Sequence, residues 1–457
     1  MRGKAILISA LLGALLSLQA AAQTATDMAV LRGLAPVTVL ANSKEGKAAL
    51  AANYTVTGGI QTGVIRQSTL LPFPEQQQQA LRDAFITRDN LAELADGLGT
   101  TLAAAWLARA HYIDQSHSTR LSQSVADVIA YANALTAMNS NSGKFLFANA
   151  TTDGKTPVSA EALEILSKNN GETDIFGKSY GFPAGAPGAD PYGDSRPFQT
   201  EPSTSQFLGP DYFNIPAGNT VYNRGPMMNL IDSPSFPSGH TTYGYTGALI
   251  LALLVPERYQ QMMARAAEYG NDRIIVGAHY AMDVLAGRTL ALYDMAHLLA
   301  NDPLYVGLAL QRAPAITNFQ SAIRKARSDA IAILQTSCGN TTQECSREDT
   351  GRLSDPTADE AFYIETQTYN LPVVYPENAY RKEDVARLAP EAGYLLTVAF
   401  PSLTLDQANH ILTETEGPGG GFLDNGSPFG IYSRLNLYAA AGRAAGVVPQ
   451  QENAAHN

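Results

Sequence analysis

The chain contains 457 residues, of which 45% are hydrophobic and only 16% are charged; this excludes an intrinsically disordered protein and allows one large or two medium domains. It carries 42 Asp and Glu residues against 31 Lys and Arg residues, giving a formal net charge of -11, and it has no basic run. This acidic balance argues against nucleic acid as a partner.

The first 22 residues have the pattern of a secretory signal peptide. Arg2 and Lys4 give a charged start, residues 5–18 form an apolar run, and residues 20–22 are small residues suited to cleavage. The run is too short for a stable membrane span, which needs about 20 apolar residues, and no later segment reaches that length. We therefore expect an exported protein, periplasmic or secreted, without stable membrane insertion.

Residues 23–150 are expected to form an N-terminal helical region, because two sets of apolar residues recur at the spacing of one helix face. The first set is Leu91, Leu94, Leu98, Leu102 and Ala105, and the second is Val125, Val128, Ala132 and Leu135. The stretch 181–197 is rich in glycine and proline and is expected to be a long loop.

Residues 151–302 are expected to form a catalytic core with three helices. Residues 241–254 are predicted to form a buried helix. A second helix is predicted over residues 258–269, with Gly270 as its C-cap. The third is predicted over residues 279–299.

Residues 303–457 are expected to form a C-terminal extension that begins with a long helix and contains both cysteines, Cys338 and Cys345. Six residues separate the two cysteines, and an exported protein favours a disulfide between them. A zinc site would need further ligands, and no histidine lies nearby, so no metal site is predicted. Strand signals are sparse along the chain, and the predicted fold class is all-α.

The chemistry is concentrated around two histidines, the first of which follows Pro237-Ser238-Gly239. Ser238 brings a hydroxyl, and Gly239 allows the backbone to approach an anion at the start of a helix, where free N–H groups favour negative charge. His240 can give a proton to a leaving oxygen. Upstream, Arg196 offers a planar, bidentate donor for phosphate oxygens.

The second histidine, His279, precedes Asp283 by four residues, which places both side chains on one helix face. The carboxylate can hold one ring N–H and leave the other nitrogen as a directed lone pair, either for a nucleophile or for a metal ligand. Arg273 lies six residues before His279, and Gly277 offers the break that separates their helices.

Three segments together resemble the class A bacterial acid phosphatases: Ser235 to Gly244, Glu268-Tyr269-Gly270, and Arg273 followed by His279 and Asp283. These enzymes belong to the type 2 phosphatidic acid phosphatase superfamily, which includes the vanadium haloperoxidases. The superfamily signature has three blocks: a lysine seven residues before Arg-Pro, then Pro-Ser-Gly-His, then Ser-Arg, His and Asp at fixed spacing. The resemblance covers about residues 189–288 and implies a helical bundle of the acid phosphatase and vanadium haloperoxidase type.

The second block is complete, and the third departs only at Asp272, where the family has serine. The first block keeps Arg196-Pro197, but Ala189 stands at the lysine position. The nearest upstream lysine, Lys178, is a possible substitute. Losing one charge-assisted phosphate contact costs about 1.5–3 kcal/mol, which weakens catalysis without necessarily abolishing it.

The resemblance implies that His279 attacks phosphorus to form a phosphohistidine and that Asp283 orients it. It further implies that His240 protonates the leaving alcohol and later activates water, without a metal or cofactor. The remaining implied residues bind phosphoryl oxygens: Arg196, Ser238, Gly239 and Arg273. The expected activity is therefore hydrolysis of small-molecule phosphomonoesters by an exported acid phosphatase.

Two other functions stay open at this point. In a vanadium-dependent haloperoxidase, His279 would ligate vanadate and His240 would serve peroxide chemistry. A degenerate phosphate-binding protein is favoured by Ala189 alone. The sequence identifies neither the natural substrate nor the oligomeric state.

Overall fold

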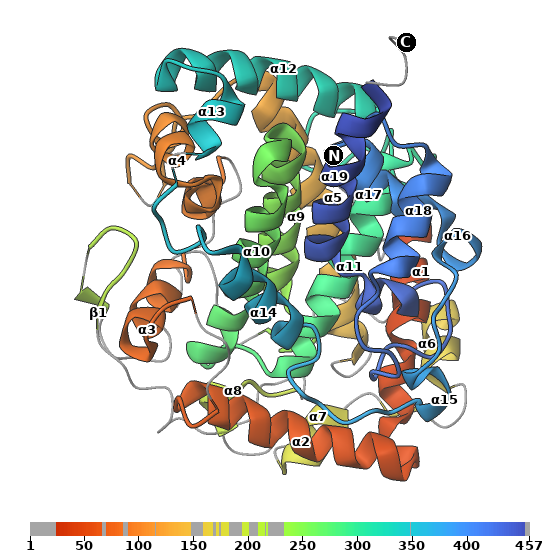
Figure 1. Ribbon diagram of the computed structural model, residues 1–457. Helices are drawn as coiled ribbons and strands as arrows, with labels where there is room; N and C mark the ends of the chain where they lie inside the picture. Colours follow the sequence, from red (N-terminus) through yellow and green to blue (C-terminus); the bar gives the residue numbers. More distant parts are fainter. Residues whose placement is uncertain are drawn as a thin grey trace, which may run out of the picture.

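Four long helices form the centre of the molecule, and the other helices surround them (Figure 1). They are α5 (Gln123–Phe147), α9 (Gly239–Leu254), α10 (Tyr259–Ile275) and α11 (Ala281–Leu299).

The computed structural model describes residues 24–65, 70–85, 90–114, 116–147, 159–167, 171–172, 175–181, 194–200, 209–214, 216–217, 233–347 and 349–452. The predicted signal peptide lies outside the described residues.

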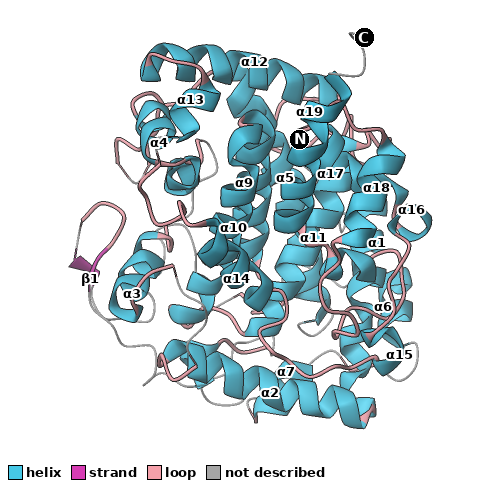
Figure 2. Cartoon of the chain, in the orientation of Figure 1, coloured by secondary structure: helices cyan, strands magenta, loops and turns pink. Residues whose placement is uncertain are grey.

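Nearly all the regular secondary structure of the described residues is helical, and loops join the helices (Figure 2). Before α5 the elements are α1 (Ala25–Leu34), η1 (Ala35–Asn42), α2 (Lys44–Gln61), α3 (Phe73–Arg82), η2 (Ala92–Leu98) and α4 (Thr100–Leu107). Between α5 and α10 are also α6 (Ala160–Ser167), α7 (Ile175–Tyr180), α8 (Pro197–Thr200), β1 (Gly209–Pro210), β2 (Pro216–Ala217) and η5 (Pro256–Arg258). After α11 come α12 (Phe319–Cys338), α13 (Thr342–Arg347), α14 (Pro356–Thr366), α15 (Pro376–Ala379), α16 (Val385–Leu388), η6 (Pro390–Gly393), α17 (Tyr394–Thr397), α18 (Leu405–Glu414), η7 (Gly430–Arg434) and α19 (Leu437–Glu452). The two short strands pair antiparallel.

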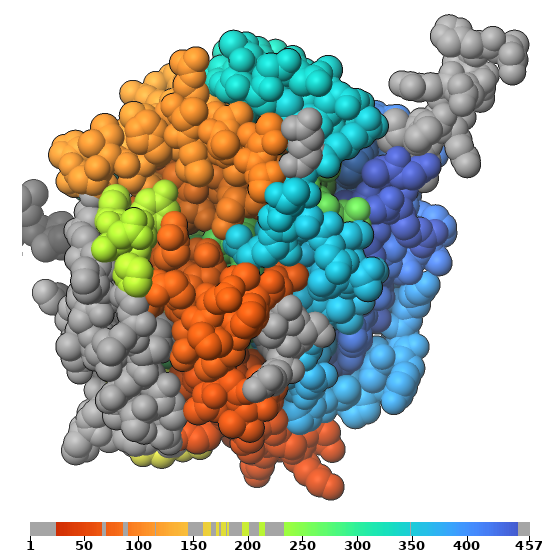
Figure 3. Space-filling view, turned by 60° about the vertical axis from the view of Figure 1, so that its left-hand side comes forward, coloured from red at the N-terminus to blue at the C-terminus, as the bar shows by residue number. Residues whose placement is uncertain are grey.

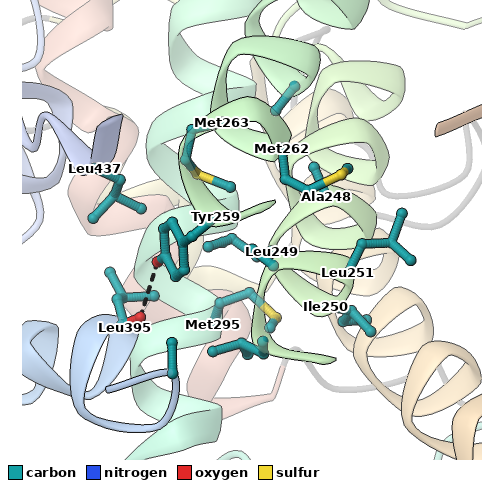
Figure 4. Close-up of a cluster of buried hydrophobic side chains, with 14 of the residues drawn as sticks. Ala248, Leu249, Ile250, Leu251, Tyr259, Met262, Met263, Met295, Leu395 and Leu437 are labelled. Atoms are coloured by element: carbon teal, nitrogen blue, oxygen red, sulfur yellow. Dashed lines mark hydrogen bonds between the residues drawn. The ribbon is translucent and has the colours of Figure 1, made fainter. Parts of the chain in front are cut away.

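Helix α9 is almost fully buried among the central helices. Its N-cap is Ser238, whose hydroxyl oxygen accepts the backbone N–H of Thr241 at 3.1 Å, and it ends before Pro256, which cannot continue a helix. Its apolar residues pack against α10 and α11, where methionines fill the space between the helices (Figure 4). On the edge of this cluster the Tyr259 hydroxyl donates to the carbonyl oxygen of Leu395 at 2.9 Å.

The N-terminal helices share one face of the molecule with the segment around α12 to α14 (Figure 3). An ion pair joins these parts of the chain: Arg352 Nη2 lies 2.6 Å from Asp96 Oδ2. The disulfide between Cys338 and Cys345 is present at the end of α12, as the sequence predicted.

The two ends of the central bundle differ. Helix α12 lies across one end, where Arg327 Nε donates to the Leu253 carbonyl at the end of α9. Helix α2 lies across the other end, where Thr57 Oγ1 accepts the Ala281 N–H at the start of α11 at 3.1 Å. The candidate site lies at this second end. Within the described residues, no helix has the length and apolar character needed to cross a bilayer.

Two predicted helix boundaries were wrong. Gly270 is not a C-cap, because α10 continues to Ile275. A Cβ atom on Gly270 would lie 3.1 Å from a methyl of Val284, so glycine there permits close packing of α10 on α11. The apolar set from Leu91 to Ala105 is buried as expected, but it spans two elements. Gly99, with φ of +87°, separates η2 from α4.

Candidate active site

A tight turn between α10 and α11 places the histidine of the third block. The chain leaves α10, turns at Gly277 with φ of +70°, and enters α11. The backbone N–H groups of Ala278 and His279 both donate to the Arg273 carbonyl oxygen, at 3.0 and 3.2 Å. The predicted break at Gly277 is therefore confirmed, and it brings Arg273, in the last turn of α10, close to His279, which lies just before the N-cap of α11.

His279 and Asp283 are both completely buried and face each other. His279 Nδ1 lies 3.3 Å from Asp283 Oδ2 and 3.3 Å from Ser235 Oγ. The Ser235 hydroxyl and the backbone N–H of Tyr280 donate to the same carboxylate oxygen. The Nδ1 side of the ring is thus held by a hydrogen-bonded carboxylate.

Arg196 holds the other side of the His279 ring. Its Nη1 lies 3.2 Å from His279 Nε2 and donates to the Ala278 carbonyl oxygen at 2.9 Å. Because a guanidinium has N–H donors and no acceptor, its hydrogen bond to Nε2 requires a lone pair there. The partners therefore assign the ring proton to Nδ1, beside Asp283, and the lone pair to Nε2.

The N-terminal end of α9 approaches the same place. The backbone N–H of Ser238 donates to the Asp283 carbonyl oxygen at 3.0 Å, which fixes the start of α9 against α11. Gly239 is the first residue of α9 and His240 the second. The ring centroids of His240 and His279 are 6.1 Å apart, with the rings inclined by 69°. The positive end of the helix dipole therefore lies beside the two histidines.

Arg273 brings hydrogen-bond donors that have no partner among the described residues. Its Nη2 donates to the Ala80 carbonyl oxygen at 3.2 Å, and its guanidinium carbon lies 4.9 Å from the centre of the Tyr269 ring. Nε and Nη1 are buried without an acceptor in the described part of the chain. Unsatisfied buried donors are costly, so an oxyanion that accepts from them would bind with added free energy.

Burial and charge set the ionisation of the histidine pair. Burial and then the neighbouring positive charges, Arg196 first among them, lower the pKa of His279 well below its usual value of 6.5. Burial raises the pKa of Asp283 to about 6, and the hydrogen bond from Ser235 acts in the opposite direction. A neutral His279 with its lone pair on Nε2 is the form that a nucleophile requires.

Residues 191–300, which contain both histidines, match the family model described as the PAP2 superfamily. The chain therefore contains a PAP2 superfamily domain. Its all-α fold is that of the superfamily.

Short segments of curated phosphatases are similar to this domain. The chain is 47% identical over 64 residues to a non-specific acid phosphatase of Salmonella typhimurium, a match that covers 14% of this chain and 26% of that protein. It is 40% identical over 84 residues to a non-specific acid phosphatase of Providencia stuartii, covering 18% and 34%. It is 36% identical over 78 residues to a lipid A 1-phosphatase of Rhizobium johnstonii, covering 17% and 31%. The chain thus spans only about a quarter to a third of these relatives.

The PAP2 domain brings together the predicted catalytic and phosphate-binding residues, whereas Lys178 and the two cysteines lie outside the matched residues. Lys178 is exposed on α7, and its Nζ forms an ion pair with Glu172 Oε2 at 3.1 Å. The structure therefore places this ammonium at the surface, and the role of Lys178 as a substitute stays a prediction. Ala189, at the family's lysine position, lies outside the described residues.

Two residues near His279 were not predicted from the sequence. Ser235 lies just before the second block and outside the signature, although its hydroxyl contacts both Asp283 and His279. Lys144 is buried on α5, and its positive charge is one of the causes that lower the pKa of His279. Nothing in the sequence around Lys144 resembles a motif, so only the packing of α5 on α9 reveals it.

Asp272, which stands where the third block of the family has serine, belongs to a different hydrogen-bond network. It forms a side-chain hydrogen bond with Asp83, whose carboxylate in turn accepts two hydrogen bonds from Arg265, at 2.6 and 2.7 Å. Burial, followed by the charges of Asp83 and Glu268, raises the pKa of Asp272 well above its usual value. Among the described residues, Asp272 is thus linked through Asp83 to Arg265 and not to the histidine pair.

No cluster of three or more His, Cys, Asp or Glu side chains that could hold a metal ion occurs within the described residues. A cavity of about 330 Å³ lies on another face of α11, lined by Met282, Leu285 and Thr289 among others. It is separate from the face that carries Asp283.

Proposed function

We propose that this protein is an exported, metal-independent acid phosphatase that hydrolyses small-molecule phosphomonoesters through a phosphohistidine. The observation that carries the proposal is the placement of His279, whose Nε2 lies 3.2 Å from Arg196 while Nδ1 faces Asp283. A neutral imidazole with one nitrogen held by a carboxylate and the other beside a cation suits attack on a bound phosphoryl group.

In the proposed first step, the Nε2 lone pair of His279 forms a bond to phosphorus as the bond to the leaving oxygen breaks. His240 gives its proton to that oxygen, so the alcohol leaves neutral. In the second step, His240 takes a proton from water, whose oxygen attacks phosphorus and breaks the P–N bond. Inorganic phosphate leaves, and both histidines return to their first state.

The proposed phosphate-binding groups are the side chains of Arg196, Ser238 and Arg273 together with the backbone at Gly239. The two N–H groups of Arg273 that lack an acceptor in the described part of the chain support this role. Phosphoryl transfer mostly needs positioning and stabilisation of charge, which arginine side chains and a helix N-terminus can supply.

The comparisons support a phosphoester as substrate, since the similar proteins are named acid phosphatases and lipid A 1-phosphatases. We propose a soluble phosphomonoester because the higher identities are to the acid phosphatases. An acidic working range is also proposed, because His240 must carry a proton to act as the acid. A rate that rises steadily to pH 9 would contradict this range.

Export and domain organisation are part of the same proposal. The disulfide between Cys338 and Cys345 supports an oxidising compartment outside the cytoplasm, with residues 1–22 as signal peptide. The family match over residues 191–300 lies within the proposed catalytic core of residues 151–302. Residues 23–150 and 303–457 would then frame this core. Cell fractionation with and without residues 1–22 tests the export.

The function can be tested with a chromogenic aryl phosphate at pH 5 to 7 in the presence of EDTA, with and without vanadate. Turnover that survives EDTA and is blocked by vanadate supports the phosphatase. Halide oxidation with vanadate and peroxide, in the absence of phosphatase turnover, would instead indicate a haloperoxidase. Phosphate binding with neither activity would indicate a binding protein.

A further inference from the structure

Lys144 is a buried cation that the family motifs do not predict. It lies near the end of α5 and only 4% of its surface is exposed. Its Nζ donates to the carbonyl oxygen of Pro234 at 2.8 Å and to that of Ser235 at 3.3 Å. Burying an ammonium is costly, so a lysine in such a position is expected to serve a specific purpose.

The preceding residue explains how α5 comes so close to the second block. A Cβ atom on Gly143 would lie 3.1 Å from Pro237 Cδ, so glycine allows α5 to pack directly on the Pro-Ser-Gly-His segment. A Cβ atom on Gly239 would lie 3.4 Å from Lys144 Cε. The lysine side chain therefore passes beside the first residue of α9.

Lys144 and Arg196 meet at one acceptor. The Pro234 carbonyl oxygen accepts from Lys144 Nζ at 2.8 Å and from Arg196 Nη2 at 2.9 Å. The same guanidinium reaches His279 Nε2 through Nη1, at 3.2 Å. One chain of contacts thus leads from the ammonium to the nitrogen that would attack phosphorus.

The charges around His279 favour an anion. Three cationic side chains, Lys144, Arg196 and Arg273, act on His279. Among the described residues, two buried carboxylates are hydrogen-bonded to residues 235 and 236: Asp283 accepts from Ser235 Oγ, and Asp194 Oδ2 accepts the Phe236 N–H at 2.6 Å. A dianion such as phosphate complements this excess of positive charge.

We propose that the ammonium of Lys144 is a phosphate-binding cation of this site and replaces the lysine that the family carries seven residues before Arg196. The proposal rests on the function proposed above. Lysine has three rotatable donors on a flexible stem, so Nζ can keep a carbonyl bond while it donates to a phosphoryl oxygen. The charge missing at Ala189 would then come from another helix, 52 residues before Arg196 in the chain.

The test measures binding of inorganic phosphate by calorimetry, together with kcat/KM for an aryl phosphate. Lys144→Met should weaken phosphate binding about tenfold or more, the range expected for one charge-assisted hydrogen bond. Lys144→Arg, which keeps the charge, should recover most of the affinity. Lys325→Met is the matched control at an exposed lysine on α12, away from the candidate site, and should leave both quantities within twofold of wild type.

The Lys144→Gln variant distinguishes phosphate binding from a purely structural role, in which the side chain only hydrogen-bonds to the carbonyls of residues 234 and 235. Glutamine can donate to the carbonyls of Pro234 and Ser235 but carries no charge, so it should behave like methionine. Wild-type affinity in Lys144→Gln, or an affinity within twofold of wild type in Lys144→Met, would overturn the proposal. If Lys144→Met does not fold, the comparison of the Gln and Arg variants decides.

The outcomes also separate this proposal from the proposed function. If the wild type hydrolyses the substrate and its phosphate affinity does not depend on Lys144, only the role of the lysine is rejected. Lysine-dependent phosphate binding without any turnover would reject only the phosphatase. A wild-type protein that binds no phosphate would overturn both.

Discussion

Ser235 donates a hydrogen bond to the Asp283 oxygen that also faces His279. The backbone N–H of Tyr280 donates to the same oxygen at 2.9 Å. These bonds favour the ionised carboxylate, whereas burial disfavours it and raises its pKa to about 6. The serine therefore sets the pH below which Asp283 can no longer hold the Nδ1 proton of His279.

Ser235→Ala should move the acidic limb of the pH profile. Asp283 must be ionised to orient His279, so kcat/KM should fall as the pH drops through about 6. Removing the hydroxyl removes a hydrogen bond that lowers this pKa, and the limb should shift to higher pH. Profiles of kcat/KM against pH with one substrate test this, because titration of the substrate is then common to both proteins. Ser235→Thr keeps a hydroxyl and serves as control; coincident limbs for wild type and alanine variant would contradict the prediction.

His279→Ala should abolish phosphatase activity. The substitution removes the proposed nucleophile, and losses of about a thousandfold or more are typical of such changes. Steady-state hydrolysis of an aryl phosphate measures it, with His410→Ala as control because His410 is exposed on α18. A His279→Ala protein that retained more than a few per cent of the wild-type rate would exclude His279 as nucleophile.

Local sequence patterns predicted the parts of the site that depend on short spacing. The break at Gly277 was predictable from its sequence position. His279 and Asp283 do pair, but not on one helix face as predicted, because His279 precedes Tyr280, the N-cap of α11. The disulfide was predictable from the short separation of Cys338 and Cys345.

Contacts between distant segments were not predictable. Lys178 is near Arg196 in sequence but exposed, whereas Lys144 is distant in sequence and buried at the site. Nothing local distinguishes the two lysines, because the packing of α5 on α9 decides which one is enclosed. Gly270 illustrates the same limit. It permits close packing of α10 on α11, and the local sequence does not distinguish such a glycine from one that ends a helix.

Gly287→Ala should destabilise the protein and impair the site. A Cβ atom on Gly287 would lie 2.4 Å from the Ser238 carbonyl oxygen, so α9 and α11 would have to separate at the start of α9. We expect a loss of about 1–3 kcal/mol in the free energy of unfolding, as for other overpacked positions. Urea unfolding measures it. Gly58→Ala in α2 is the control, since nothing lies within 4 Å of the added Cβ; equal stabilities of the two variants would contradict the close packing.

The stability of the Asp272→Asn variant relative to wild type should increase as the pH rises. The pKa of Asp272 is raised well above 3.8 in the folded protein, so folding takes up a proton at neutral pH. The stability that depends on this proton is complete below about pH 4 and is lost as the pH rises toward the folded pKa. Asparagine resembles the protonated acid and does not titrate, so the variant avoids this loss.

Unfolding free energies of the Asp272→Asn variant and wild type at pH 4 and pH 7 test the sign. Asp329→Asn should show the opposite trend, because a hydrogen bond from Ser124 and the neighbouring Lys325 lower the pKa of Asp329. A stability difference for Asp272→Asn that is the same at both pH values would show that Asp272 is not protonated in the fold.

Removing the disulfide should lower stability without changing catalysis. Cys338 and Cys345 close a short loop between α12 and α13, and α12 lies across the end of the bundle opposite α2. Loop closure of this length is worth about 2–3 kcal/mol in the chain-entropy description. The double variant Cys338→Ala, Cys345→Ala should therefore unfold at lower urea concentration while kcat and KM at 25 °C stay within twofold of wild type. No contact in the described part of the chain joins either cysteine to His240 or His279 directly. A large fall in kcat at temperatures where the variant remains folded would therefore show that the C-terminal extension is coupled to the histidine site.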